Sequence, residues 1–381
     1  RTDRFYDASN GHAPTSTVDG TKRPGQLKGC RPTRCAGEPA MPRHMIKNSN
    51  NGHASRLAPT CHCVIMDVDM GVDDAIALIT TLHDPSIRLL GVTTVAGNTS
   101  SLQAALNTLF LLEQFSLREP VPVRVGAGRT LRGMTPAPAP QVHGPDGLGG
   151  VSRRYWAARS NPTVKTGASE YLLESVSRFG NTLSILATGP LTNIAQAIQQ
   201  APETMEQLGR LLIMGGAVER PGNITPHAEF NAYTDPEALA LVLSSGLPIT
   251  LFPLNVTEQV RMRVSTLEEQ LASQAKKMVL IRDLTSHYCR FHAETLGFNG
   301  SFLHDVFPVI ALERPDLFRY ESISFDVEVS DAERRGALSR RHHHGQRISV
   351  AVSVDAQTTL DAIWTTLQHP DPATRYSPVI D

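Results

Sequence analysis

The 381-residue sequence has few aromatic residues, few cysteines and almost no net charge. Aromatic residues make up only 6%, which argues against a protein that binds single-stranded nucleic acid by base stacking. A formal charge of -1 argues against a DNA backbone or a membrane surface as partner. The five cysteines lack the pattern of a disulfide framework, and no apolar run approaches the ~20 residues of a membrane span. We therefore expect a protein of a reducing compartment, the cytoplasm, with neither nucleic acid nor membrane as partner.

Residues 1–60 differ in composition from the rest of the chain. They hold ten Lys or Arg and four Asp or Glu, a charge of +6, which leaves 26 basic and 33 acidic residues for 61–381. They contain only five Val, Ile, Leu or Phe residues, the types that build hydrophobic cores: Phe5, Val18, Leu27, Ile46 and Leu57. We predict a disordered basic extension, because so little apolar area cannot offset chain entropy. The sequence leaves open whether it is native, an organelle-targeting segment or an artefact.

From residue 61 onward, short apolar runs alternate with helical patterns. Strands are expected at residues 63–66, 87–95, 121–125, 183–187, 211–214 and 249–254, and helices at 73–83, 101–115, 168–179, 191–199 and 236–244. A longer helical stretch (267–296), two later strands (323–329 and 347–355) and two long loops (126–160 and 217–234) complete the pattern. Apolar strands alternating with helices indicate a mostly parallel sheet covered on both faces. The sequence therefore predicts a single Rossmann-like α/β domain over residues 61–381.

Four carboxylates, Asp67, Asp69, Asp73 and Asp74, follow the first predicted strand within eight residues. Open α/β sheets bind ligands beyond the carboxyl ends of their strands, so this is the first place to look for a site. Carboxylates this close repel one another, and a bound cation relieves that repulsion. Oxygen ligands alone favour Ca²⁺ or Mg²⁺ over zinc. Asp67 and Asp69 are expected on one face of the strand by its two-residue period.

The cluster allows three interpretations, of which two are enzymes and one is a binding protein without catalysis. A Mg²⁺-dependent phosphatase with Asp67 as nucleophile and Asp69 as acid–base partner shares the strand-D-x-D start, but such enzymes usually have Thr or Val where this chain has Gly71. A non-catalytic protein that uses Ca²⁺ to bind ribose or nucleosides would bind without turnover. The remaining reading is a hydrolase of nucleosides, and it depends on motifs beyond the cluster.

The run of residues 67–75, DVDMGVDDA, resembles the D-x-D-P-G-x-D-D-A signature of the inosine–uridine-preferring nucleoside hydrolases, with Met70 where the signature usually has Pro. Later segments match the family in the same order: residues 95–98, 143–149, 187–193, 214–216, 222–223, 228–231, 235–238 and 303–305. The resemblance spans about residues 62–370. It implies the nucleoside hydrolase architecture and Ca²⁺-dependent hydrolysis of the N-glycosidic bond of ribonucleosides, which yields ribose and free base in nucleoside catabolism and salvage.

The resemblance also implies roles for individual residues. Ca²⁺ would be held by Asp69, Asp74, Asp305 and the backbone carbonyl of Thr188. Asp69 would also take the proton from the metal-bound water, and Asp67 would support the site through hydrogen bonds. The family is known to form homo-oligomers, so a homodimer or homotetramer is expected.

On the substrate side, the family pattern assigns the ribose to Asp73, Asn98, Asn223, Glu229 and Asn231. Glu229 and Asn231 would face one side together if their segment were extended. His304, next to Asp305, is the expected acid for the leaving base, because histidine titrates near neutrality. His143 and Tyr288 are expected beside the base, whereas His287, His292 and residues 342–344 are expected to be ordinary surface or core histidines.

Overall fold

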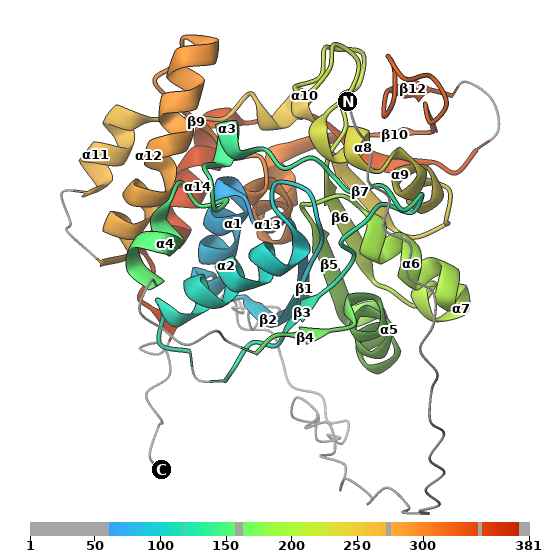
Figure 1. Ribbon diagram of the computed structural model, residues 1–381, viewed down its shortest axis with the longest axis horizontal. Helices are drawn as coiled ribbons and strands as arrows, with labels where there is room; N and C mark the ends of the chain where they lie inside the picture. The colour runs from blue at the N-terminus through green and yellow to red at the C-terminus, as the bar shows by residue number, and fades with distance from the viewer. Residues whose placement is uncertain (1–60, 118, 157–162, 272–275, 342–344, 373–381) are drawn as a thin grey trace, which may run out of the picture. The chain divides into compact units, whose positions relative to one another are not determined.

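Nine strands form the central sheet, in the order β10-β13-β7-β6-β5-β1-β2-β3-β4 (Figure 1). The computed structural model describes residues 61–117, 119–156, 163–271, 276–341 and 345–372, so the predicted extension over 1–60 and histidines 342–344 lie outside the described residues. The strands are β1 (His62–Val68), β2 (Ile87–Thr94), β3 (Val123–Val125), β4 (Lys165–Thr166), β5 (Leu183–Ala187), β6 (Arg210–Met214), β7 (Ile249–Phe252), β10 (Phe318–Ile323) and β13 (Ile348–Val354). All neighbours are parallel except β10, which runs antiparallel to β13.

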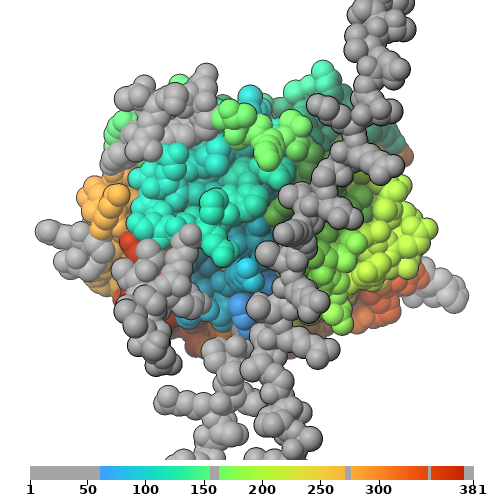
Figure 2. Space-filling model, turned by 90° about the horizontal axis from the view of Figure 1, so that it is seen from below, coloured from blue at the N-terminus to red at the C-terminus, as the bar shows by residue number. Residues whose placement is uncertain are grey.

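Helices cover both faces of this sheet (Figure 1). One face carries α1 (Val72–His83), α2 (Ser101–Glu113), α12 (Lys276–Leu296), α13 (Val306–Glu313) and α14 (Ala356–Gln368). The other carries α5 (Ala168–Phe179), α6 (Thr192–Gln200), α7 (Pro202–Met205) and α9 (Pro236–Leu243). Seen from below in Figure 2, the teal and green segments that hold α2 and α5 to α7 form much of the surface, and the blue start of the described chain shows between them. The predicted fold class, a mostly parallel sheet flanked by helices, is confirmed.

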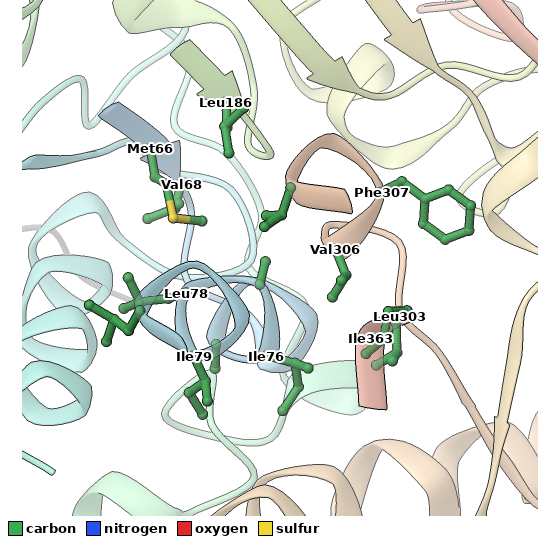
Figure 3. Close-up of a cluster of buried hydrophobic side chains, with 14 of the residues drawn as sticks. Met66, Val68, Ile76, Leu78, Ile79, Leu186, Leu303, Val306, Phe307 and Ile363 are labelled. Carbon is green, nitrogen blue, oxygen red and sulfur yellow. The ribbon is translucent and has the colours of Figure 1, made fainter. Parts of the chain in front are cut away.

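Strand β1 shows how the sequence builds two cores. Val64, Met66 and Val68 pack into one buried cluster, while Ile65 points into the cluster on the opposite face. This follows from the two-residue period of a strand, and it requires the centre of β1, residues 63–66, to be apolar on both faces. Each such fully buried side chain contributes roughly 1.5–3 kcal/mol relative to exposure. Figure 3 labels the centre of the first cluster: Met66, Val68, Ile76, Leu78, Ile79, Leu186, Leu303, Val306, Phe307 and Ile363.

The remaining elements are short and lie in the connections. They are α3 (Pro140–His143), α4 (Val151–Trp156), α8 (Phe230–Thr234), α10 (Leu254–Thr257), α11 (Val264–Leu271), the antiparallel pair β8 (Arg261–Arg263) and β9 (Gly300–Phe302), and the antiparallel pair β11 (Phe325–Val327) and β12 (Leu338–Arg340). The two predicted long loops therefore contain α3, α4 and α8, whose four to six residues are too short to show a helical period. The predicted strand 323–329 is wrong as one element, because β10 ends at Ile323 and β11 begins at Phe325. Among the described residues, no helix has the length and apolarity needed to cross a membrane.

The core can be tested with two leucines that differ in burial. Leu78 on α1 is 0% exposed, whereas Leu102 on α2 is 50% exposed. We expect Leu78→Ala to lower the free energy of unfolding by about 2–5 kcal/mol, because it removes buried methyl groups and leaves a cavity. Leu102→Ala is the matched control and should change it by less than about 0.5 kcal/mol. Chemical denaturation of both variants checks this, and equal losses would contradict the burial described for α1.

Candidate active site

A cavity of about 630 Å³ lies at the carboxyl edge of the sheet. Its lining includes Asp73 from the start of α1, Asn98 after β2, Thr188 after β5, Met214 at the end of β6 and Asp305 directly before α13. Segments far apart in the sequence meet there because parallel strands bring their carboxyl ends to one edge. The cavity is therefore where an open α/β sheet is expected to bind its ligand.

Three carboxylates stand together at this cavity. Asp73, Asp74 and Asp305 can each place one oxygen within 4.8 Å of the other two, and all three side chains are buried. Burial, together with repulsion from Asp74, raises the pKa of Asp73 to about 7. Burial and the neighbouring aspartates also raise the pKa of Asp305 well above its usual range. The Oδ1 atom of Asp73 has no hydrogen-bond partner among the described residues. An orphaned carboxylate oxygen within an all-oxygen donor set fits a hard divalent cation.

Asp74 is held from two sides. Its Oδ1 accepts a hydrogen bond from the Thr188 hydroxyl at 2.5 Å, and its Oδ2 accepts one from the Gly71 backbone N–H at 2.7 Å. The second bond also caps the N-terminus of α1. The carbonyl of Thr188 accepts a hydrogen bond from Asn231 Nδ2 at 2.7 Å, which leaves it a second lone pair. Thr188 thus orients Asp74 through its side chain and keeps its carbonyl available as a further oxygen donor.

Asp69 is fully buried beside this group. Its Oδ2 accepts a hydrogen bond from the backbone N–H of Asn98 at 2.7 Å, and its Oδ1 accepts one from Asn98 Nδ2 at 3.1 Å. Burial, followed by repulsion from Asp74, raises the pKa of Asp69 well above its usual range. The loop after β2 can approach this closely because residue 97 is glycine: an added Cβ would stand 2.1 Å from Asp69 Oδ2. Among the described residues, Asp69 and Asp74 lie behind those that line the cavity.

Asp67 accepts hydrogen bonds from the two elements beside it. Its Oδ1 accepts hydrogen bonds from the Thr93 hydroxyl on β2 at 2.6 Å and from Asn193 Nδ2 on α6 at 2.7 Å. Burial raises its pKa to about 6. Asp67 is fully buried and lies outside the cavity lining, as Asp69 and Asp74 do, but its Oδ1 is committed to Thr93 and Asn193. This geometry fits the predicted supporting role and argues against Asp67 as a phosphatase nucleophile.

His143 connects the loop after β3 with the start of α1. Its Nδ1 accepts a hydrogen bond from the backbone N–H of Val72 at 3.1 Å, so the neutral ring carries its proton on Nε2. Burial lowers the pKa of His143 to about 3. The ring stacks on Tyr288, with centroids 5.3 Å apart, and both residues line the cavity as expected. Residue 71 must be glycine for this approach, because an added Cβ would stand 2.8 Å from the His143 ring.

The loop after β6 brings three predicted ribose ligands to the cavity: Asn223, Glu229 and Asn231. The condition that residues 229–231 are extended is not met, because Phe230 begins α8 and Glu229 is its N-cap. The Glu229 carboxylate accepts hydrogen bonds from the backbone N–H groups of Gly216 (2.8 Å), Asn231 (2.8 Å) and Ala232 (3.0 Å). A helix start leaves such N–H groups without intrahelical partners, and the Glu229 side chain satisfies them.

His304 lines the cavity next to Asp305. Its Nδ1 lies 2.7 Å from the hydroxyl oxygen of Thr257. Burial, with smaller contributions from His292, His143 and Arg220, lowers the pKa of His304 to about 3. The near-neutral titration expected from the sequence is therefore not found, because the ring is desolvated. A neutral imidazole still has one N–H group, so His304 can donate one hydrogen bond into the cavity.

Several cavity residues were not identified from the sequence. His292 was expected to be an ordinary surface or core residue, but it is buried in the cavity wall, with its ring centroid 4.4 Å from that of Tyr288. Its spacing of four residues from Tyr288 on a helix was the available signal. Arg220, Arg261, Phe291, Phe298 and Phe302 also line the cavity. His287 is half-buried and its Nε2 lies 3.2 Å from the carbonyl oxygen of Gln141, as expected for an ordinary surface or core histidine.

Met70 departs from the signature in conformation as well as in identity. Its φ of 44° lies in the left-handed region, which proline cannot adopt because its ring fixes φ near about −65°. The side chain is fully buried in the core beneath the site. The turn at residue 70 is therefore one that proline could not form, and the buried Met70 side chain anchors it to the core.

Comparison with known proteins gives consistent matches. A family model described as "Inosine-uridine preferring nucleoside hydrolase" matches residues 64–361. Probable uridine nucleosidase 1 of Oryza sativa subsp. japonica is 37% identical over 265 residues, 70% of this chain and 81% of that protein. Uridine nucleosidase 1 of Arabidopsis thaliana is 37% identical over 265 residues, 70% of this chain and 78% of that protein. The solved plant nucleoside hydrolase PpNRh1 matches with a TM-score of 0.76 and 30% identity, covering 82% of this chain and 100% of that one.

The fold and the site together define an α/β enzyme with a buried carboxylate group at the edge of a parallel sheet. The chain belongs to the inosine–uridine preferring nucleoside hydrolase family. The predicted family, fold and hydrolase class are thereby confirmed. The roles of the individual residues stay predictions.

The raised carboxylate pKa values predict an unusual pH dependence of stability. Burial lowers the pKa of His143 and His304 to about 3, so these two rings add stability as pH rises toward the unfolded pKa of about 6.5 and little more above it. Asp73, with a folded pKa of about 7, and Asp69 and Asp305, with raised pKa values, bind more protons folded than unfolded. Their contribution to stability is present at low pH and is lost as pH rises through the folded pKa. We expect the melting temperature of chelator-treated protein to fall as pH rises through about 7, the folded pKa of Asp73.

Added Ca²⁺ should remove this loss, because a cation favours the ionised carboxylates. Differential scanning calorimetry with and without chelator measures both effects. The variant Asp73→Asn should show a smaller pH dependence. A chelated protein that gains stability over this pH range would contradict the carboxylate assignment.

Proposed function

We propose that the protein hydrolyses the N-glycosidic bond of ribonucleosides in a Ca²⁺-dependent reaction that releases ribose and the free base. The observation that carries this proposal is the juxtaposition of Asp73, Asp74 and Asp305 with the polar groups that line one cavity. Uridine is the first substrate to test, because the rice and Arabidopsis relatives are named uridine nucleosidases. Inosine is the second, since the family model names both nucleosides.

The cation would be held by Asp69, Asp74, Asp305 and the carbonyl of Thr188. These oxygen donors suit Ca²⁺, and Asp73 stands close enough to Asp74 and Asp305 to contribute as well. A bound cation would lower the pKa of the attacking water and orient it. It would also offset the repulsion that, after burial, raises the pKa values of Asp69, Asp73 and Asp305.

Asp69 takes the proton from the attacking water. Its two hydrogen bonds from Asn98 fix the carboxylate and favour its ionised form, which a base requires. As the water oxygen bonds to C1′ of the ribose, the N–C1′ bond breaks and its electron pair leaves with the base. Asp67 supports this arrangement by linking β1 to Thr93 and Asn193.

Five residues would hold the ribose hydroxyls: Asp73, Asn98, Asn223, Glu229 and Asn231. The base would lie toward His143 and Tyr288, whose stacked rings form one wall of the cavity. His304 serves as the acid for the leaving base. Because its ring is neutral, it acts by donating a hydrogen bond toward the negative charge that develops on the base.

The homodimer or homotetramer and the cytoplasmic location stay predictions from the sequence. The phosphatase alternative is disfavoured by the hydrogen bonds that hold Asp67 between β2 and α6 and by membership of a nucleoside hydrolase family. The alternative of a binder without turnover is disfavoured by membership of a hydrolase family.

The metal and the general base can be tested with Asp69→Asn. The substitution keeps the shape of the side chain but removes a charged ligand and the base, so turnover of uridine should fall by ~10²–10⁴. The Ca²⁺-dependent rise in melting temperature should shrink as well, because binding to the native state causes it. The control Asp361→Asn removes an exposed carboxylate on α14 and should alter neither property. Near-normal turnover in Asp69→Asn would refute this mechanism.

The role of His304 can be tested by comparing two leaving groups. Uracil leaves poorly as an anion, so His304→Ala should slow uridine hydrolysis by ~10²–10⁴. A p-nitrophenyl riboside releases a stable phenolate and should be nearly unaffected. The comparison also controls for damage to the adjacent Asp305, which would slow both substrates alike. Equal losses in kcat on the two substrates would show that His304 is structural.

A further inference from the structure

We infer that Thr257 is a positioning residue that holds His304 in one tautomer, with the ring proton on Nε2, so that the ring presents a donor to the leaving base. The effect on catalysis rests on the proposed function, whereas the tautomer of His304 depends only on its contact with Thr257. It assigns a task to a residue outside the motifs of the sequence.

The contact between the two residues is short and shielded from water. Thr257 Oγ1 lies 2.7 Å from His304 Nδ1, Thr257 is 0% exposed and His304 is 8% exposed. Thr257 is the last residue of α10, where its backbone N–H donates to the carbonyl of Pro253 at 3.2 Å. On its other side the His304 ring packs against Phe302, with centroids 5.5 Å apart and planes 35° apart. The ring is therefore fixed in place as well as hydrogen-bonded.

The direction of the hydrogen bond follows from the hydroxyl. A threonine hydroxyl has one proton to donate and can also accept. Among the residues that the structure describes, the only partner recorded for this hydroxyl is His304 Nδ1. If Nδ1 carried the ring proton, the hydroxyl would accept and its own proton would be buried without an acceptor, which is unfavourable. The hydroxyl therefore donates, and Nδ1 accepts.

The tautomer decides what the ring can do for catalysis. With Nδ1 as acceptor, a neutral ring carries its proton on Nε2, the nitrogen turned away from Thr257. Since His304 lines the cavity, this N–H is the group that it presents to a departing base. The opposite tautomer would present a lone pair to a group that gains negative charge, and it would repel that group. Thr257 thus acts on the reaction through His304 without touching the substrate.

Thr257→Val and Thr257→Ser form a matched pair for the test. Valine keeps the branched shape and removes the hydroxyl, whereas serine keeps the hydroxyl and loses a methyl group. We expect Thr257→Val to lower kcat on uridine by about tenfold or more, with little change in KM or in turnover of a p-nitrophenyl riboside. Thr257→Ser should recover most of the lost turnover. In a His304→Ala background, Thr257→Val should have no further effect, because the ring it positions is gone.

The outcomes separate this inference from the proposed function. If Thr257→Val slows both substrates alike, or if serine is as impaired as valine, Thr257 is merely structural and the inference is overturned. If the wild-type protein does not hydrolyse uridine or inosine at all, the proposed function fails. The tautomer is then still tested by ¹⁵N NMR of histidine-labelled wild-type protein, which distinguishes protonated from unprotonated ring nitrogens. A His304 signal with the proton on Nδ1 would overturn the inference, and a proton on Nε2 would support it.

Discussion

Mutual repulsion among buried carboxylates is the constraint on which the rest of the site depends. Asp73, Asp74 and Asp305 form one buried group with Asp69 beside it. Burial raises the pKa of all four carboxyls, and repulsion from neighbouring aspartates raises those of Asp69, Asp73 and Asp305 further. A protein keeps such a group only if something else stabilises it. Here backbone N–H groups and the Thr188 hydroxyl hold the carboxylates in place, and a divalent cation would supply the missing positive charge. The fold of the family to which the chain belongs brings these carboxylates together at the carboxyl edge of the sheet.

The same burial acts on the histidines in the opposite direction. Desolvation raises the pKa of the acids, and it lowers the pKa of His143 and His304 to about 3 each, so that their rings are neutral. Each ring turns Nδ1 to a donor in the protein, namely the backbone N–H of Val72 for His143 and, by our inference, the hydroxyl of Thr257 for His304. A single property of the cavity, its low exposure to water, therefore sets the form of both the acids and the imidazoles.

The sequence predicted the elements whose patterns are local and periodic. The expected helix at residues 168–179 and strand at 183–187 match α5 and β5 in both bounds, because an amphipathic period and an apolar run both lie within one segment. The family motifs placed most of the cavity residues in advance. Contacts between segments that carry no motif could not be predicted, since nothing in the sequence relates Thr257 to His304. The conformation of Met70 was also hidden, because it depends on the packing of its side chain.

The side of the cavity where we propose that the ribose binds, called here the ribose side, shows how the fold prepares polar groups for a ligand. An ionised carboxylate has about four lone-pair positions, and Glu229 uses three of them on backbone N–H groups. Asn223 uses its amide oxygen on the N–H of Phe230, which leaves its NH₂ group to donate. Asn231 is tied through Nδ2 to Thr188, so it joins the ribose side to the carboxylate group. A ribose that bonds to the remaining positions would find these side chains already fixed, and little further entropy would be lost in ordering them.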